Sequence, residues 1–326
     1  MQSFWNTLKK PFFVMAPMAD VTDVAFRALV AARGAPDVSW TEFVSADGLY
    51  HTREIQKMKD AENPLMRDLL FSKGEHPIVA QVFSSRPEMI VYAAKLVAEL
   101  GFDGMDINMG CPDRAIERQG CGAAMIKNPK LAQELIRTAQ GAGSLPVSVK
   151  TRVGYNKESL DEWLTALLEA NPTAITLHLR TRKEMSLVPA DWELMKKAVV
   201  LRDRVNPSVL LIGNGDVQDL EDGRAKIAES GCDGAMLGRA MFGNPWVFAG
   251  KKPGDTSLAE KLASLTELAY GFEKISPPKN FAILKKHIKA FVTGFAGAVE
   301  LRARLMQAES ANEIEKIALD AVRLRV

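Results

Sequence analysis

The chain has 326 residues, of which 47% are hydrophobic and 25% are charged, and its formal net charge at pH 7 is +2. This composition supplies enough apolar side chains for a large buried core, which excludes a disordered protein. The three cysteines, Cys111, Cys121 and Cys232, form no CxxC or Cys/His cluster, so we expect no disulfide framework, no metal site and a reducing, cytoplasmic compartment.

The chain starts with a polar and aromatic segment, Met1–Pro11, that lacks the apolar core of a signal peptide. No apolar stretch reaches the ~20 residues that a membrane-spanning helix needs, so we expect no membrane association.

Short apolar runs then alternate with longer amphipathic segments. The runs are Phe12–Met18, Val38–Ser45, Ile78–Phe83, Gly104–Met109, Val147–Val153, Ala174–Leu179, Val209–Gly213 and Gly234–Leu237. A helix is expected from about Thr22–Asp23, and others over Pro87–Leu100, Pro129–Ala139, Lys157–Ala170, Trp192–Leu201 and Leu220–Ser230. Pro87 and Pro129 suit first-turn positions, and Gly101 and Gly231 suit helix C-termini.

The alternation of apolar runs and helical segments predicts a parallel sheet. An open doubly wound sheet is the alternative, but eight repeats favour a (β/α)8 TIM barrel.

The pattern changes after Trp246. Lys251–Thr256 is polar and resembles a linker, and four helical segments are expected after it. They are Ser257–Ile275, Asn280–Phe291, Ala296–Gln307 and Ala311–Arg323. We therefore expect a barrel domain over residues 1–250 and a small all-α bundle over residues 251–326. The bundle region carries 13 Lys and Arg against 9 Asp and Glu, or +4. This charge permits an anionic partner, although solvated helix faces explain it equally well.

Polar residues at the ends of the expected strands are the candidates for function, because barrel active sites lie at the C-terminal ends of the strands. They are Ala16, Pro17, Met18, Gln81, Asn108, Met109, Gly110, Cys111, Pro112, Lys150, Arg152, His178, Arg180, Asn214, Gly215, Asp216, Gly238 and Arg239. Seven of the eight strands supply at least one of them.

The turns after the last two strands suit a phosphate group. Gly213–Gly215 and Gly238 allow close backbone approach, and Arg239 adds a positive charge. Ordinary tight turns would also use these glycines.

Lys150 lies within an apolar run and needs a polar or anionic partner. That partner is either the N1 side of a reduced flavin or a structural carboxylate. The amides of Gln81 and Asn108 are able to bond a flavin's pyrimidine edge or to be ordinary buried amides. His178 and Arg180 share a side-chain direction, which suits a ligand clamp or a bonded core histidine.

Cys111 ends the fourth strand, where a protonated thiol would serve as an acid, although most free cysteines are buried hydrophobes. Cys121, between two glycines ten residues later, is its rival for that role. Cys232 precedes the eighth strand, at the opposite end of the barrel, and is expected to be structural.

Taken in order, these residues resemble the tRNA-dihydrouridine synthase family. The matching stretches are Ala16–Met18, Thr22–Asp23, Phe26–Arg27, Thr41–Glu42, Asp106–Pro112, Gly120–Ala124, Lys150–Arg152, His178–Thr181, Ala190–Trp192, Gly213–Asp216, Gly238–Ala240, Lys286–His287, Gly294–Ala298 and Leu301–Arg302. The Asn-x-Gly-Cys-Pro stretch at residues 108–112 is the most specific of them. One departure is Leu179, where the family commonly has glycine, and Lys183–Pro189 lacks the Gln and Tyr found there.

The resemblance implies a cytoplasmic, monomeric oxidoreductase that reduces uridine in tRNA with FMN, itself reduced by NADPH. It implies that Cys111 is the general acid. It also implies that the cofactor is held by Ala16, Pro17, Met18, Gln81, Asn108, Lys150, His178, Asn214, Gly215, Asp216, Gly238 and Arg239. Contacts with tRNA would come from Arg152, Arg180, Lys286, His287 and Arg302.

Two other functions remain open at this point. One is a flavin barrel that reduces a small molecule, which would have no need for a basic helical tail. The other is a tRNA-binding or folding factor that retains a flavin scaffold, against which the intact Cys111 and Lys150 argue.

Overall fold

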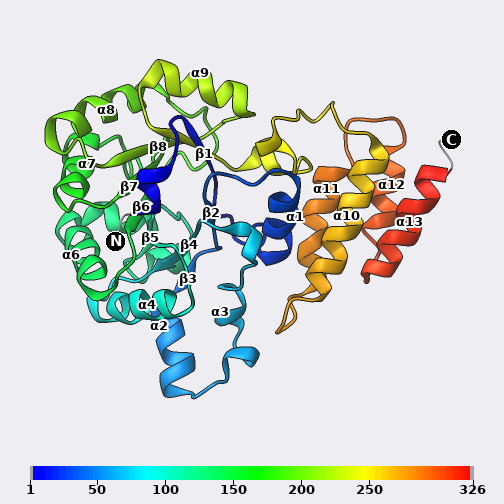
Figure 1. Cartoon of the computed structure of the whole chain (residues 1–326), viewed down its shortest axis with the longest axis horizontal. Coiled ribbons are helices and arrows are strands. Elements are labelled where there is room, and N and C mark those ends of the chain that lie inside the picture. The colour runs from blue at the N-terminus through cyan, green and yellow to red at the C-terminus, as the bar shows by residue number, and fades with distance from the viewer. Residues whose placement is uncertain (1–2, 324–326) are drawn as a thin grey trace.

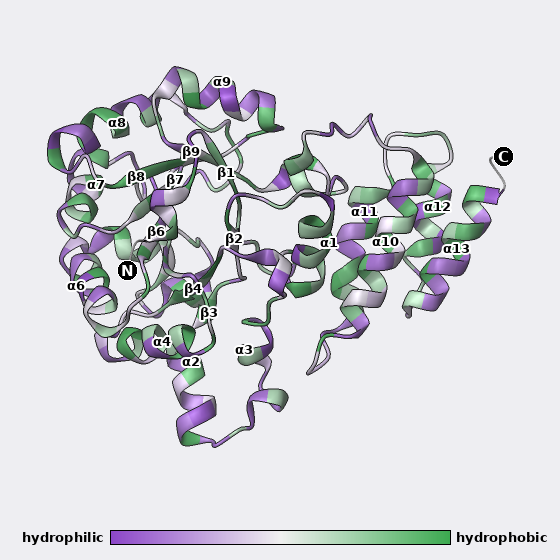
Figure 2. Ribbon diagram, in the orientation of Figure 1, coloured by the Kyte–Doolittle hydropathy of each residue, from purple (hydrophilic) through white to green (hydrophobic). Residues whose placement is uncertain are grey.

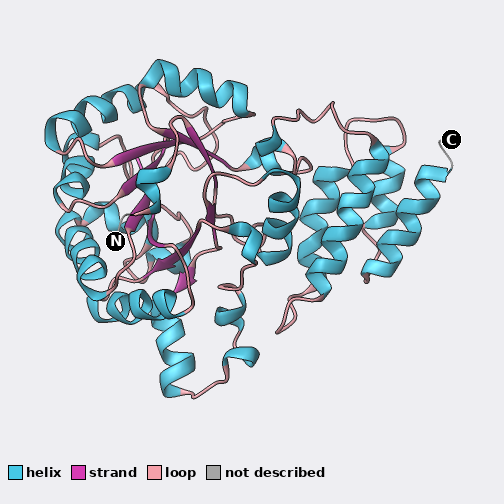
Figure 3. Ribbon diagram, viewed as in Figure 1, coloured by secondary structure: helices cyan, strands magenta, loops and turns pink. Residues whose placement is uncertain are grey.

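The computed structural model describes residues 3–323, so the last three residues of the expected helical domain lie outside it. Its central sheet is entirely parallel (Figures 1 and 3). The strands are β1 (Phe12–Met15), β2 (Ser39–Trp40), β3 (Val44–Ser45), β4 (Ile78–Phe83), β5 (Gly104–Met109), β6 (Val147–Arg152), β7 (Ala174–His178), β8 (Leu210–Asn214) and β9 (Gly234–Leu237).

The sheet closes into a barrel. Its order is β1-β9-β8-β7-β6-β5-β4-β2, with β3 continuing the pairing to β4. A bridge between Val14 and Val38 joins β1 to the segment leading into β2, and the Met15 N–H donates to the Val38 carbonyl at 3.1 Å. This closure confirms the expected (β/α)8 barrel over the open sheet.

Alternation along the strands divides the core in two. Phe12 and Val14 point into the barrel, where they pack with Trp5, Trp40 and other side chains, while Phe13 and Met15 point outward beneath the helices. Trp5 lies 5.9 Å from Trp40 between ring centroids and fills the interior. Because both faces of each strand are covered, the strands appear in the sequence as nearly continuous apolar runs.

A ring of helices covers the strands (Figure 3). It comprises α1 (Val24–Gly34), α4 (Pro87–Glu99), α6 (Pro129–Ala142), α7 (Leu160–Glu169), α8 (Glu193–Val205) and α9 (Leu220–Ser230). Pro87 and Pro129 occupy first-turn positions, as expected. Gly101 and Gly231 have φ values of 85° and 76°, in the left-handed region that favours glycine after a helix.

The second expected strand is wrong in detail, because the structure divides it into β2 and β3. The Gln81 N–H bonds to the Thr41 hydroxyl at 3.1 Å, so a side chain replaces a backbone partner where the ladder is interrupted. The helical excursion that follows was not expected at all. It contains α2 (Ala46–Tyr50), a π-helical turn over His51–Ile55 and α3 (Pro64–Arg67).

The remaining helices form a bundle beside the barrel (Figure 1). They are α10 (Leu258–Glu273), α11 (Lys285–Phe291), preceded by a 3-10 turn at Phe281–Leu284, α12 (Ala298–Leu305) and α13 (Ala311–Arg323). We call them the helical bundle. Its helices carry hydrophobic and hydrophilic residues side by side (Figure 2), and α10 packs against α1 of the barrel. Within residues 3–323, no helix is both long and apolar enough to cross a membrane.

Candidate active site

A cavity of about 300 Å³ opens at the C-terminal ends of the strands. All the expected residues of the barrel mouth except Met109, which is buried in the outer core, line it: Ala16, Pro17, Met18, Gln81, Asn108, Gly110, Cys111, Pro112, Lys150, Arg152, His178, Arg180, Asn214, Gly215, Asp216, Gly238 and Arg239. Residues more than 200 positions apart in the sequence therefore surround one space. Its size is at the lower end of the range for small-molecule sites.

A chain of buried polar groups supports the floor of this cavity. The Ser148 hydroxyl donates to Asp106 at 2.6 Å, and the Gln81 amide donates to the other Asp106 oxygen at 2.7 Å. Asn108 donates to Gln81 Oε1 at 3.0 Å. Burial raises the pKa of Asp106 to about 6. Because each amide has already used one donor and its oxygen, Gln81 and Asn108 each have one N–H left for a ligand.

The same chain fixes the loop that carries Cys111. Asn108 Oδ1 accepts the backbone N–H groups of Gly110 at 3.1 Å and Cys111 at 2.9 Å. On the other side of the loop, the Ala123 N–H donates to the Cys111 carbonyl at 2.9 Å. Gly122 has a φ of 58°, and a Cβ there would lie 2.5 Å from the same carbonyl oxygen, so the close approach requires glycine.

The two candidate thiols differ in access. Cys111 is half-buried and lines the cavity, and burial raises the pKa of its thiol above the usual value, so the thiol is protonated at neutral pH. Cys121 is only 2% exposed, does not line the cavity, and donates to the Gln119 carbonyl at 3.5 Å. Burial raises the pKa of Cys121 to about 11. Cys232 is buried just before β9, at the other end of the barrel.

Lys150 points into the cavity and bonds a neutral partner. Its Nζ donates to Asn214 Oδ1 at 3.2 Å, while Asn214 Nδ2 donates to the Met236 carbonyl at 2.9 Å. Burial, together with the nearby Arg152 charge, lowers the pKa of Lys150 to about 8. The ammonium is therefore charged at neutral pH. Its hydrogen-bond partner is the neutral Asn214 amide, so its charge is available to an anionic ligand.

His178 and Arg180 form a fixed pair on the next side of the cavity. Arg180, 3% exposed, approaches His178 Nε2 with Nη1 at 3.1 Å and donates to the Val188 carbonyl at 2.6 Å. Burial and the surrounding cationic side chains hold the pKa of His178 far below its usual value. His178 is therefore neutral and accepts through Nε2, so it serves as a hydrogen-bonding group and not as an acid.

Asp216 connects Arg180 to Arg239. One carboxylate oxygen accepts from Arg180 and from the Ala190 N–H, and the other accepts from Arg239. Gly215 just before it has a φ of 127°, and a Cβ at that position would lie 2.7 Å from the Ala190 Cβ. Asp216 therefore orients two guanidinium groups beside a backbone that only glycine fits.

Arg152 ties together two loops at the rim of the cavity. Its Nε donates to the Gly110 carbonyl at 2.8 Å, and its Nη1 donates to the carbonyls of Thr181 and Met185 at 3.1 and 2.9 Å. Its side chain is 6% exposed, and burial lowers the pKa of Arg152 to about 10. The primary role of Arg152 in this structure is to join the Cys111 loop to the 181–189 loop.

The charges of the cavity favour an anion. Four cationic side chains line it, namely Lys150, Arg152, Arg180 and Arg239, against one carboxylate, Asp216. Within residues 3–323, no group of three or more His, Cys, Asp or Glu side chains is placed to hold a metal ion. The walls of the cavity therefore present cationic side chains, amides and one neutral thiol.

The tail residues expected to contact RNA lie outside this cavity and differ among themselves. Lys286 is exposed and pairs with Asp20 of the barrel at 3.2 Å. Arg302 Nη1 donates to the Val292 carbonyl at 3.1 Å. His287 is 2% exposed, with its ring centroid 4.6 Å from that of Phe26. The expectation that His287 contacts RNA is corrected here, because the barrel covers its side chain.

Sequence reasoning missed several cavity residues. Phe43, Ser186, Val217 and Met236 also line it. Phe43 follows the Thr41–Glu42 match, which signals that the segment is near the site. Ser186 lies in the 181–189 loop, where no pattern in the sequence marks it.

The family model described as dihydrouridine synthase matches residues 14–325 of the chain. A protein of Bacillus subtilis (strain 168) named "Probable tRNA-dihydrouridine synthase 2" is 41% identical over 329 residues, covering 99% of this chain and 97% of that protein. A "Probable tRNA-dihydrouridine synthase" of Staphylococcus epidermidis is 39% identical over 328 residues, covering 100% of this chain and 98% of that protein. The similarity extends through both the barrel and the helical bundle.

Solved structures share the fold at low sequence identity. Histamine dehydrogenase from Rhizobium sp. 4-9 superposes with a TM-score of 0.56 at 13% identity, covering 96% of this chain and 62% of that one. Morphinone reductase superposes with a TM-score of 0.50 at 11% identity, covering 76% of this chain and 89% of that one. At these identities the likeness concerns the architecture alone.

Proposed function

The chain belongs to the dihydrouridine synthase family, and from that premise we propose that it reduces the C5–C6 bond of specific uridines in tRNA to 5,6-dihydrouridine, as an FMN-dependent enzyme that takes its electrons from NADPH. The observation that carries this proposal is the position of Cys111, a half-buried free thiol on the wall of a cationic cavity at the mouth of the barrel. We also propose that the enzyme is cytoplasmic and acts as a monomer.

The cavity suits a flavin mononucleotide. Its cationic excess matches an anionic cofactor with one phosphate, and Gly215 and Gly238 bring backbone to the cavity wall that Arg239 also lines. Lys150 has an ammonium available for the anionic side of a reduced ring, and Gln81 and Asn108 each have an N–H available for its pyrimidine edge. Ala16, Pro17 and Met18 would form one wall, and His178, Asn214 and Asp216 would hold the charged groups in place.

When bound, the reduced flavin supplies the hydride that saturates C6 of uridine. The chain itself must supply a proton at C5 and a site that positions the base. Cys111 is suited to the proton, because its thiol is neutral and its loop is bonded on both sides. A positioned general acid contributes ~10²–10⁴-fold to such a step.

The base must leave its stack to enter a cavity of this kind. We propose that residues 251–326 form a domain that holds the tRNA while one uridine enters, with Lys286 and Arg302 among its contacts. Arg152 and Arg180 would affect tRNA binding indirectly, because their guanidinium groups hold the 181–189 loop in place at the rim of the cavity. The side chain of Leu187 on that loop is 85% exposed and available to a nucleic acid surface.

Formation of dihydrouridine in vitro tests this proposal. The purified protein, reconstituted with FMN, is incubated with NADPH and with tRNA from cells that lack the gene, and dihydrouridine is measured position by position by mass spectrometry. We expect dihydrouridine to appear at the positions that the deletion leaves unmodified. NADPH oxidation without dihydrouridine, but with turnover of a small enone, would indicate a small-molecule reductase instead.

A further inference from the structure

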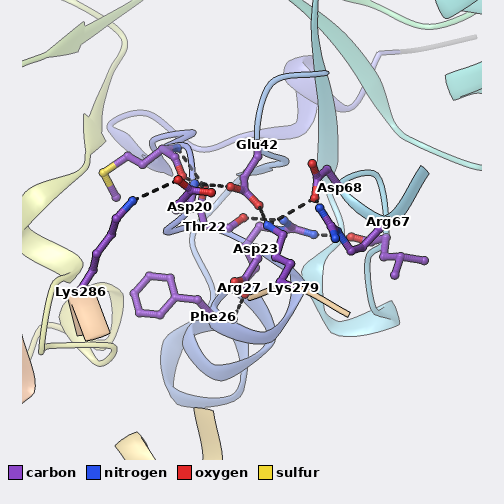
Figure 4. A network of polar contacts seen from close by, with 12 residues as sticks. Asp20, Thr22, Asp23, Phe26, Arg27, Glu42, Arg67, Asp68, Lys279 and Lys286 are labelled. Atoms are coloured by element: carbon purple, nitrogen blue, oxygen red, sulfur yellow. Dashed lines mark hydrogen bonds and ion pairs between the residues drawn. The ribbon is translucent and has the colours of Figure 1, made fainter. Parts of the chain in front are cut away.

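Lys279, in the segment between α10 and α11, enters a pocket of carboxylates on the barrel (Figure 4). Its Nζ lies 2.6 Å from Glu42 Oε2 and 3.3 Å from Asp68 Oδ1. The side chains of Lys279 and Glu42 are only 4% and 6% exposed. The Glu42 and Asp68 carboxylates outweigh the effect of burial and keep the pKa of Lys279 above its usual value, so Lys279 remains charged.

Glu42 has a second partner, which belongs to a different part of the molecule. Its other oxygen, Oε1, accepts the backbone N–H of Asp20 at 2.5 Å. Asp20 lies in the loop between β1 and α1, which spans residues 16–23. One buried carboxylate is therefore shared between the helical bundle and that loop, as Figure 4 shows.

The 16–23 loop forms part of the candidate active site. Ala16, Pro17 and Met18 line the cavity, and the Met18 N–H is held by the Thr22 hydroxyl at 2.9 Å. Asp20 has a φ of 56°, in the left-handed region that non-glycine residues seldom adopt. The loop therefore depends on hydrogen bonds such as that from Asp20 to Glu42 to hold its shape.

A charged carboxylate this deeply buried requires its cationic partner. Without Lys279, Glu42 would retain a desolvated charge, and it would be favoured either to take up a proton or to turn toward solvent and release the Asp20 N–H. The pair between Arg33 of α1 and Glu267 of α10 lacks this property. It joins the same two parts of the molecule at 2.7 Å, but Glu267 is 57% exposed. The hydrogen bonds of Arg33 go to Leu29, Ser264 and Glu267, all of them outside the 16–23 loop.

We propose that Lys279 is a positioning residue for the cofactor site: it fixes the Glu42 carboxylate, which fixes the wall formed by Ala16–Met18. The helical bundle then completes the cavity in addition to holding RNA. This inference rests on the proposed function only for the identity of the cofactor. The link between Lys279 and the loop is a property of the protein alone.

The first test measures the loop in cofactor-free, full-length protein. Amide hydrogen exchange of residues 16–23 is compared in the wild type, Lys279→Met and the matched control Arg33→Met, which removes a cation from the same interface. We expect faster exchange in this segment for Lys279→Met only. Unchanged exchange, or equal acceleration in both variants, would overturn the positioning role, and neither result depends on whether the chain binds FMN.

The second test measures FMN affinity by quenching of flavin fluorescence. We expect Lys279→Met to weaken FMN binding roughly tenfold, as for the loss of a buried charged partner. Arg33→Met should stay within about twofold, because the carboxylate of its pair is 57% exposed and the pair lies away from the cavity wall. Lys279→Met with Glu42→Gln should recover most of the affinity, because the uncharged amide that replaces the carboxylate still has an oxygen to accept from Asp20. Faster loop exchange with unaltered FMN affinity would overturn the connection to the cavity.

The double variant Lys279→Met with Glu42→Gln also allows the proposal to be tested if the single variant does not fold. If Lys279→Met alone fails to fold, the comparison is made between the double variant and Glu42→Gln. Equal FMN affinity in these two proteins is expected, because both lack the charge that Lys279 neutralises. A further large loss in the double variant would show that Lys279 acts by some route other than Glu42, and would overturn the proposal.

Discussion

The side-chain oxygen of Asn108 accepts the backbone N–H of Cys111 at 2.9 Å, three residues further along the chain. Asn108 is itself held by Gln81, and Gln81 by the buried Asp106. The backbone that carries the Cys111 thiol is therefore held in place by a polar chain that begins inside the barrel.

Cys111→Ala should retain FMN and its reduction by NADPH but lose most dihydrouridine formation, by ~10²–10⁴-fold. The reason is that accepting electrons needs no thiol, whereas saturating the C5–C6 bond needs a proton at C5. Cys121→Ala is the matched control and should cost little activity, because Cys121 does not line the cavity. Flavin reduction and dihydrouridine yield are measured separately in both proteins. An active Cys111→Ala beside an inactive Cys121→Ala would reverse the assignment.

Gly122→Ala should lower dihydrouridine formation while leaving Cys111 itself intact. A Cβ at this position would lie 2.5 Å from the Cys111 carbonyl oxygen, on a backbone whose φ of 58° already disfavours alanine. The Cys111 loop must therefore move. Gly141→Ala, where a Cβ would meet nothing within 4 Å, provides the control. Single-turnover reduction of tRNA is compared in the two variants, and equal rates would contradict the predicted movement.

The bound cofactor should be FMN and not FAD. In the cavity of about 300 Å³ we expect one phosphate position, next to Arg239, and no GxGxxG fingerprint follows the first strand. Mass spectrometry of the compound released by denaturing the purified protein distinguishes FMN from FAD. Release of FAD, or a colourless protein that FMN does not reconstitute, would refute this prediction.

Lys286→Ala together with Lys289→Ala on α11 should weaken tRNA binding. Both side chains are exposed, and each lost phosphate contact should reduce the slope of log affinity against log salt by roughly one unit. The control is Lys95→Ala with Lys130→Ala, two exposed lysines on outer helices of the barrel. If both double variants lose affinity equally, net charge is responsible and α11 has no specific role.

His287 should make the protein less stable in mild acid. Burial lowers the pKa of His287 to about 4, below the ~6.5 of an unfolded histidine, so the unfolded state alone binds a proton between these values. The effect of His287 on the free energy of unfolding is nearly absent above pH 7. It should lower that free energy by about 2 kcal/mol at pH 5. Urea unfolding of the wild type and His287→Phe at pH 7.5 and pH 5 measures it. The variant should lose less stability on acidification, and an equal loss would contradict the assignment.

The sequence predicted the barrel well because each strand is buried on both faces. The limits of β4, β5 and β9 agree with the expected runs, since strands covered on both faces are mostly apolar. The polar exceptions, Gln81, Asp106 and Asn108, are hydrogen-bonded to one another. The excursion over residues 46–67 was missed for the opposite reason. Its helices are short, and what holds them is tertiary burial of side chains such as Leu49 and Met66, which leaves no local periodicity.

The sequence by itself also determined most of the polar residues that surround the cavity, because parallel strands bring the residues at their C-terminal ends to one face of the barrel. Only the tertiary structure decided what each of them does there. Hydrogen bonds are short-ranged and directional, so their partners depend on packing and not on spacing in the chain. Asn108 is bonded to Gln81, His287 is buried against Phe26, and Lys279 reaches Glu42 across 237 positions of sequence.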